Sequence, residues 1–169
     1  MVGLFVEQVN LFALQPQIGR THGQHALPIT VGFCFATILS RILTNIQSAN
    51  SAAEKLVGKI SGAVGVYNAQ VGLGIAARCG DKTFEERVLE KLGLKAVPIS
   101  TQILPPEPLA DYLFSCVKLS AAFGQFGRDG RHLMRTEIAE LGEPFEKGQL
   151  LDVRSTGKRH VTDSFLFEH

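Results

Sequence analysis

The sequence has few cysteines, almost no net charge and no hydrophobic run long enough to cross a bilayer. Its three cysteines, Cys34, Cys79 and Cys116, are widely spaced and form neither a CxxC pair nor a metal-ligand spacing. This pattern favours reduced thiols in a cytoplasmic protein and predicts no metal site. The formal net charge is only +1, so the chain lacks the electrostatic footprint of a nucleic-acid-binding or membrane-surface protein.

The hydropathy pattern also argues against a membrane segment or a secretory signal. The most apolar stretch, residues 26–39, ends at Ser40 and Arg41, short of the ~20 residues that span a bilayer. Near the start of the chain, Glu7 and Asn10 interrupt the apolar residues at helical spacing, which a signal peptide would not do. We therefore expect a soluble protein that stays in the cytoplasm.

The apolar residues repeat with a helical period along most of the chain. Between residues 31 and 60 they recur at steps of three and four, with polar residues between them. This pattern predicts one long amphipathic helix that begins after Pro28, where the missing N–H of proline has no cost. A helix of this length indicates a bundle. With 45% hydrophobic and 20% charged residues, the chain can bury the core of one domain.

Two further helices are predicted downstream. Thr83 and Glu86 have the spacing of a capping box, which predicts a helix that starts at this point and ends at Gly93. Another helix begins after a proline cluster and carries apolar positions from residue 109 to residue 138. Three glycines weaken its middle by roughly 1 kcal/mol each where they are exposed, so we expect close helix packing or a kink there. These are Gly124, Gly127 and Gly130.

Strand signals are weak. The segment 96–99 is a short candidate, and Pro98 argues against it because proline cannot donate to a sheet. On pattern alone, the sequence therefore predicts an all-α fold, a bundle of long helices that associates with other copies.

A polar turn precedes the long helix, and it holds the strongest candidate for chemistry. Residues 19–28 read GRTHGQHALP, so His22 is flanked by Thr21 and by a glycine that permits close backbone approach. An imidazole in this setting could bind and protonate an anionic substrate, since histidine titrates near neutral pH. The alternative is that His22 and His25 only hydrogen-bond the backbone where the helix starts.

Four blocks of the sequence resemble adenylosuccinate lyases of the fumarase/aspartase superfamily. Residues 20–24 (RTHGQ) are similar to the first block of that family, and residues 62–69 (GAVGVYNA) to its glycine-rich segment. Residues 100–102 (STQ) resemble its substrate-contacting turn, and residues 143–149 (EPFEKGQ) the segment before its mobile catalytic loop. Argininosuccinate lyases and fumarases usually have THLQ in the first block, so THGQ together with STQ favours the adenylosuccinate branch.

The resemblance implies an all-α central domain that builds a large bundle in a homotetramer, with each active site shared among three subunits. It also implies β-elimination of fumarate from adenylosuccinate and succinyl-carboxamide ribotide in purine biosynthesis, without a cofactor. The implied partners are these nucleotides, with AMP and fumarate as products, and other copies of the chain.

Four site residues follow from the resemblance by position. His22 is the expected general acid that protonates the departing nitrogen. Thr21 and Gln102 are expected to hold carboxylate or phosphate oxygens of the substrate, and Asn68 to line the pocket. The structural alternatives are that Gln102 is an ordinary turn residue and that Asn68 is a polar residue that breaks a helix beside Gly65.

The resemblance ends at Gln149. The family continues into a Gly-Ser-Ser-x-Met-x-x-Lys-x-Asn-Pro loop that supplies the general base, whereas residues 150–160 read LLDVRSTGKRH. We do not assign Ser155 as the base, because the spacing is short and the other loop residues are missing. We therefore divide the chain into a central helical region, 1–149, and a divergent tail, 150–169, which we expect to be disordered. A chain without the loop is expected to be inactive alone.

Whether the chain is an enzyme is left open by the sequence. The first hypothesis is a truncated fumarate-releasing C–N lyase of the adenylosuccinate lyase type. The second is a non-catalytic helical interaction or oligomerisation module that has kept the bundle and lost the chemistry. A third is another fumarate-releasing lyase of the superfamily that acts on a different substrate.

Overall fold

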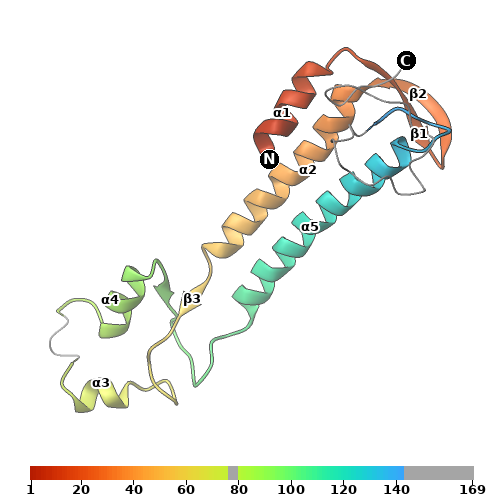
Figure 1. Ribbon diagram of the computed structural model, residues 1–169. Coiled ribbons are helices and arrows are strands. Elements are labelled where there is room, and N and C mark those ends of the chain that lie inside the picture. Colours follow the sequence, from red (N-terminus) through yellow and green to blue (C-terminus); the bar gives the residue numbers. More distant parts are fainter. Residues whose placement is uncertain (76–79, 143–169) are drawn as a thin grey trace, which may run out of the picture. The chain divides into compact units, whose positions relative to one another are not determined.

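The computed structural model describes residues 1–75 and 80–142, and helices dominate these ranges (Figure 1). The fold divides after Leu119 into two compact units, and the last helix continues from one into the other. The elements are, in chain order, α1 (Val2–Leu11), β1 (Pro16–Thr21), β2 (Gln24–Thr30), α2 (Val31–Ala53), β3 (Val57–Gly58), α3 (Asn68–Gly72), α4 (Phe84–Lys91), β4 (Lys95–Ala96) and α5 (Glu107–Leu133).

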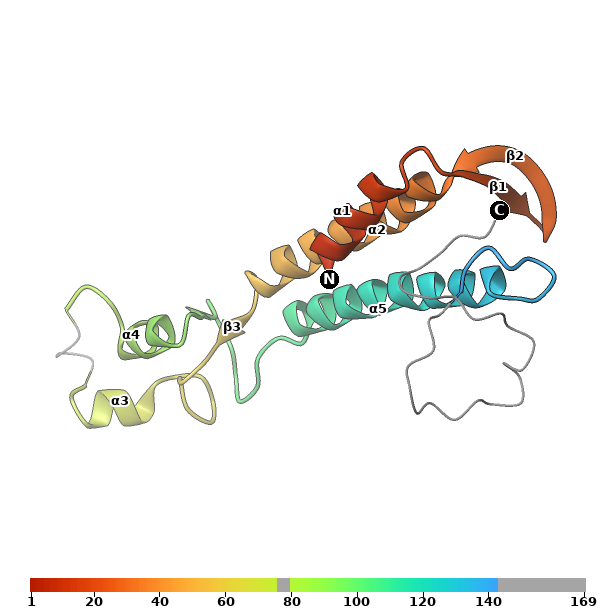
Figure 2. The ribbon, with the colours of Figure 1, turned by 45° about the horizontal axis from the view of Figure 1, so that its top comes forward.

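The core of the first unit lies where α1 packs alongside α2, as both views show (Figures 1 and 2). The rings of Phe5 and Phe35 meet edge to face, with centroids 6.1 Å apart. Ile38 and Ile42, one turn apart on α2, are buried as the helical period predicts. The amphipathic pattern of this region is thus confirmed at Ile38 and Ile42, and Phe35 of α2 packs against Phe5 of α1.

The start of the long helix agrees with the apolar period, whereas the predicted entry at Pro28 and the predicted end are wrong. α2 begins at Val31, and its N-cap is Thr30, whose hydroxyl accepts a hydrogen bond from the Phe33 backbone N–H. It ends at Ala53 rather than near Ile60. The apolar period continues past this point, but Val57 pairs in parallel with Lys95, so tertiary strand pairing overrides the helical pattern. The helix still has 23 residues, a length of about 34 Å.

The prediction of a strictly all-α fold is wrong, because two small sheets accompany the helices. β1 and β2 form an antiparallel hairpin from the segment predicted as a polar turn, and Pro28 lies within β2 opposite Ile18. The second sheet is the parallel pair β3–β4, and β4 overlaps the weak strand candidate 96–99 only at Ala96. Both proline and glycine disfavour strands in a sequence pattern, but an edge position tolerates them.

The second predicted helix is confirmed as α4. Its N-cap Thr83 accepts from the Glu86 N–H, and the Glu86 carboxylate accepts from the Thr83 N–H, so both halves of the capping box form. Gly93 follows the helix with a φ of 72°, and the next N–H, of Leu94, donates to the Leu89 carbonyl. The helix therefore ends on a left-handed glycine, as the sequence predicts.

The third predicted helix is α5, which has 27 residues and ends at Leu133 rather than at Ile138. It runs as unbroken α-helix through the three glycines at which we expected close helix packing or a kink. In the first unit, α5 lies alongside α2: the Asn45 side chain donates to the Lys118 carbonyl at 3.3 Å, and the Lys118 ammonium contacts the Ser48 hydroxyl at 3.2 Å. Polar contacts thus join these two helices.

Some predictions fall outside the described ranges. The block 143–149, the tail 150–169 and Cys79 all do, so the boundary at residue 149 stays a prediction. Across residues 1–75 and 80–142, none of the helices combines the length and the apolarity that a bilayer crossing requires.

Candidate functional site

His22 lies at the tip of the β1–β2 hairpin. His22 and Gly23 form a two-residue loop with φ angles of 54° and 73°, between the paired residues Thr21 and Gln24. Positive φ at both loop residues is the pattern of a type I′ turn, whose twist matches that of the flanking strands. A positive φ is uncommon outside glycine, and such outliers cluster at functional sites. The hairpin therefore presents an exposed imidazole on a tight turn.

Thr21 and His22 are brought together by the same turn. The Thr21 hydroxyl lies 3.0 Å from Nδ1 of His22, and the direction of this hydrogen bond depends on the ring tautomer. When the hydroxyl donates to Nδ1 of the neutral ring, the ring proton lies on Nε2. Thr21 therefore contacts the imidazole ring of His22, whereas the sequence resemblance implies a contact with substrate oxygens.

Gln102 belongs to a second cluster, in which the 100–102 turn packs directly against the glycine-rich segment 62–69. Gly65 has a φ of 78°, and a Cβ at this position would lie 1.9 Å from the Ser100 carbonyl oxygen. Only glycine permits this approach. The hydroxyls of Ser61 and Ser100 lie 3.3 Å apart and join the same two segments. The two segments that carry Gln102 and Asn68 therefore form one structural element.

Asn68 is the first residue of α3, and its side chain is exposed. It follows Tyr67, which has a left-handed backbone with a φ of 59°. The Tyr67 hydroxyl donates to the Glu85 carboxylate at 2.6 Å. This hydrogen bond, with burial and the negative charge as smaller causes, raises the pKa of Tyr67 above its ordinary value, so the phenol stays neutral. Glu85 thereby fixes the backbone that carries Asn68.

The four predicted site residues do not form one site within one copy of the chain. Thr21 and His22 precede α2, whereas Asn68 and Gln102 follow it, and the two clusters lie at opposite ends of this helix (Figures 1 and 2). The helix alone spans about 34 Å, far beyond the reach of one small substrate. The predicted site residues of one copy therefore fall into two separate clusters.

Two residues of the second cluster are missed by the sequence argument. Lys59 donates from its ammonium to the carbonyl oxygens of Gly62 and Gln102, at 2.8 Å and 3.1 Å. Glu85 is a buried carboxylate, only 1% exposed, that also accepts from the Ile60 N–H. No spacing rule marks either residue, because Lys59 and the Gln102 carbonyl are 43 residues apart in the sequence, and Glu85 is 25 residues from Ile60 and 18 from Tyr67.

Residues 1–75 and 80–142 contain no group of three or more histidine, cysteine, aspartate or glutamate side chains arranged to hold a metal ion. What the two clusters offer instead is an exposed imidazole, amide groups and an ammonium. This is a set of proton donors and hydrogen-bond donors that suits an anionic ligand.

The sequence and fold both match known lyases. A family model described as "Lyase" matches residues 2–149. The adenylosuccinate lyase of Thermotoga maritima is 40% identical over 144 residues, which are 85% of this chain and 31% of that protein. The adenylosuccinate lyase of Pyrococcus horikoshii is 43% identical over 136 residues, 79% of this chain and 28% of that protein. The fumarate lyase structure from Mesorhizobium sp. BNC1 has a TM-score of 0.70 and 25% identity, covering 85% of this chain and 32% of that one.

These matches define the class as a helical lyase of the fumarase/aspartase type. The chain belongs to the lyase family, and its sequence is adenylosuccinate lyase-like. It spans about a third of the length of the relatives it matches. The resemblance that the four sequence blocks predict is therefore confirmed for the family.

Proposed function

We propose that the chain contributes part-sites to an adenylosuccinate lyase reaction, the β-elimination of fumarate from adenylosuccinate and from succinyl-carboxamide ribotide. In this reaction a base removes a proton beside a carboxylate, the C–N bond breaks, and an acid protonates the departing nitrogen. The observation that carries the proposal is the exposed His22–Thr21 pair on a strained turn, in a chain 40% identical to an adenylosuccinate lyase.

The proposed role of His22 is that of general acid. With the Thr21 hydroxyl donating to Nδ1, the proton on Nε2 is available to the leaving nitrogen. Positioned acid catalysis of this kind contributes about 10²–10⁴-fold to a rate. Gln102 and Asn68 hold substrate oxygens in the second cluster, and no metal or cofactor takes part. The products are fumarate and AMP or the corresponding ribotide.

Because α2 separates the two clusters, we propose that a complete site takes His22 from one copy and Gln102 from another. The proposed assembly is a homotetramer, and the proposed compartment is the cytoplasm, where the thiols of Cys34 and Cys116 stay reduced. A single copy is then inactive, because its acid has no substrate-binding partner within reach. Nucleic acid and membranes have no role in this proposal.

Co-expression with a full-length enzyme tests this function. The partner is the Thermotoga maritima relative with its matching histidine replaced by alanine, so that it lacks the acid but keeps every other site element. We expect the mixed assembly to cleave adenylosuccinate, as followed by the loss of its absorbance. The chain carrying His22→Ala is the matched control and restores nothing. Absence of activity in verified mixed assemblies contradicts the proposal.

A non-catalytic interaction module is the second candidate, and the exposed side chains of α5 favour it. Leu109, Leu113 and Val117 follow one another at steps of four residues, and each is more than half exposed. Such a stripe on a helix is typical of a surface that packs against another helix. The same co-expression separates the two candidates, because a pure interaction module enters mixed assemblies without restoring turnover.

A further inference from the structure

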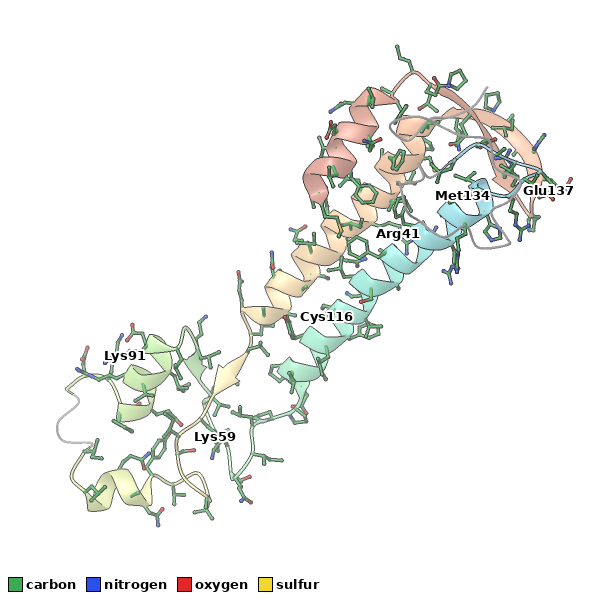
Figure 3. All side chains as sticks on the ribbon, in the orientation of Figure 1. Arg41, Lys59, Lys91, Cys116, Met134 and Glu137 are labelled. Carbon is green, nitrogen blue, oxygen red and sulfur yellow. The ribbon has the colours of Figure 1, made fainter. Side chains whose placement is uncertain are left out.

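Lys59 lies between the two segments of the second cluster. It follows β3, and Figure 3 shows it beside the chain that leads into α5. Its ammonium donates to the Gly62 carbonyl at 2.8 Å and to the Gln102 carbonyl at 3.1 Å. An ammonium has three N–H donors, so one remains after these two bonds. The side chain is half-buried and therefore keeps access to solvent.

Among residues 1–75 and 80–142, no carboxylate neutralises the positive charge of Lys59. Both of its partners are neutral carbonyl groups, and across residues 1–75 and 80–142 no carboxylate lies within 4.0 Å of its ammonium. Glu85, whose carboxylate contacts the next residue along the chain, is buried and accepts from the Tyr67 hydroxyl and the Ile60 N–H. A lysine that serves only as a surface ion pair has a carboxylate partner, as Lys82 does with Glu90 at 2.9 Å.

The backbone on both sides of Lys59 is fixed. Before it, Gly58 pairs with Ala96 and accepts a hydrogen bond from the Val97 N–H at 3.0 Å. After it, Ile60 is held at both of its polar groups, since its N–H donates to Glu85 and its carbonyl accepts from the Gln70 amide. The ammonium is therefore held in place before any ligand arrives, which lowers the entropy that binding costs.

We propose that Lys59 is an anion-binding residue of the substrate site, where it takes a carboxylate or phosphate group beside Gln102. The proposal rests on the proposed function, which supplies the anionic substrate. A hydrogen bond from an ammonium to an oxyanion is about twice as strong as one between neutral groups. Neutral carbonyls orient the cation and leave its charge for the ligand, and this is the arrangement that an anion site needs.

The test uses the full chain with two probes, fumarate and inorganic phosphate, and follows the amide resonances of Gly62 and Gln102 by NMR titration. The central variant is Lys59→Gln, whose amide can still donate to the two carbonyls but carries no charge. We expect it to weaken anion binding by at least about tenfold. Lys55→Gln, four residues earlier and exposed, is the matched control and leaves binding within about twofold.

A second variant keeps the test decisive when Lys59→Gln disturbs the fold. Hydrogen-exchange protection of the Ile60 amide reports on the surrounding network, because that N–H donates to buried Glu85. When this protection falls, Lys59→Arg decides, since it keeps the charge: retained binding supports the proposal, and lost binding overturns it. Tighter binding of fumarate assigns the site to the carboxylate end of the substrate, and tighter binding of phosphate to the phosphate end.

Two results overturn the proposal: wild-type chain that binds neither anion, and Lys59→Gln chain that binds as tightly as wild type. Neither result depends on turnover in mixed assemblies, which tests the proposed function. Anion binding that needs Lys59 without restored turnover leaves the anion site standing and removes the lyase role. Restored turnover without Lys59-dependent binding leaves the lyase role standing and overturns the anion site.

Discussion

Replacing Tyr67 by phenylalanine removes one hydroxyl and nothing else, and the effect on the second cluster follows from the structure. The hydroxyl donates at 2.6 Å to Glu85, a carboxylate that is only 1% exposed. Hydrogen bonds to charged groups contribute about 1.5–3 kcal/mol, and here the loss also leaves a buried carboxylate oxygen without a partner. We therefore expect the free energy of unfolding of this region to fall by about 1.5–3 kcal/mol.

Native-state hydrogen exchange at the Ile60 amide measures this change, because that N–H donates to the same carboxylate. The expected loss corresponds to a roughly 10- to 150-fold faster exchange through opening. Tyr112→Phe is the matched control, since Tyr112 lies on α5 and has no hydroxyl partner in the described part of the chain, so its removal costs less than about 0.5 kcal/mol. A Tyr67→Phe effect as small as that of the control refutes the reasoning.

The pH dependence of the same hydrogen bond has a definite sign. The folded-state pKa of Tyr67 is raised above its ordinary value of 10.0, chiefly by the hydrogen bond to Glu85. The neutral phenol is thus favoured by folding, and its contribution is complete below pH 10.0 and is lost as the pH rises through the folded pKa. The difference between wild type and Tyr67→Phe should therefore shrink in alkaline solution.

Two further predictions concern the glycine-rich segment and α4. Gly65→Ala places a Cβ 1.9 Å from the Ser100 oxygen at a φ of 78° and should lower the free energy of unfolding by at least about 2 kcal/mol. The control Gly74→Ala has a φ of 64° and nothing within 4 Å, and should lower it by about 1 kcal/mol. Equal losses in urea unfolding would contradict the close packing of residues 62–69 against the 100–102 turn. The pKa of Glu86 is lowered from 4.5, first by the Thr83 N–H, so its contribution to α4 is present above pH 4.5 and is lost as the pH falls through the folded pKa. NMR titration of the Glu86 carboxyl checks this, and a titration at or above pH 4.5 contradicts it.

Local rules predicted the elements that depend on neighbouring residues. The capping box of α4 and its terminating Gly93 need only contacts within a few residues, and both were predicted correctly. The burial of Ile38 and Ile42 follows from the helical period alone. These features are readable because their partners lie within one or two turns.

Long-range pairing explains what the sequence did not predict. Val57 continues the helical apolar period but leaves the helix because Lys95 offers it a strand partner. The hairpin was missed because a His-Gly loop is a weaker hairpin signal than Asn-Gly, and because each flanking strand contains a proline, Pro16 or Pro28. For the site, the resemblance supplied His22 and Gln102, but the separation of the two along α2 and the role of Lys59 needed coordinates.

The central claim is that the two ends of α2 serve different active sites, and one measurement tests it most directly. The acid-deficient full-length enzyme is co-expressed with three forms of the chain: wild type, His22→Ala and Gln102→Ala. The account predicts that wild type and Gln102→Ala restore adenylosuccinate cleavage equally, because the restored site takes only its histidine from the chain and its glutamine from a full-length subunit. His22→Ala should restore none. Loss of activity with Gln102→Ala as well as with His22→Ala, in assemblies of equal composition, would contradict the claim.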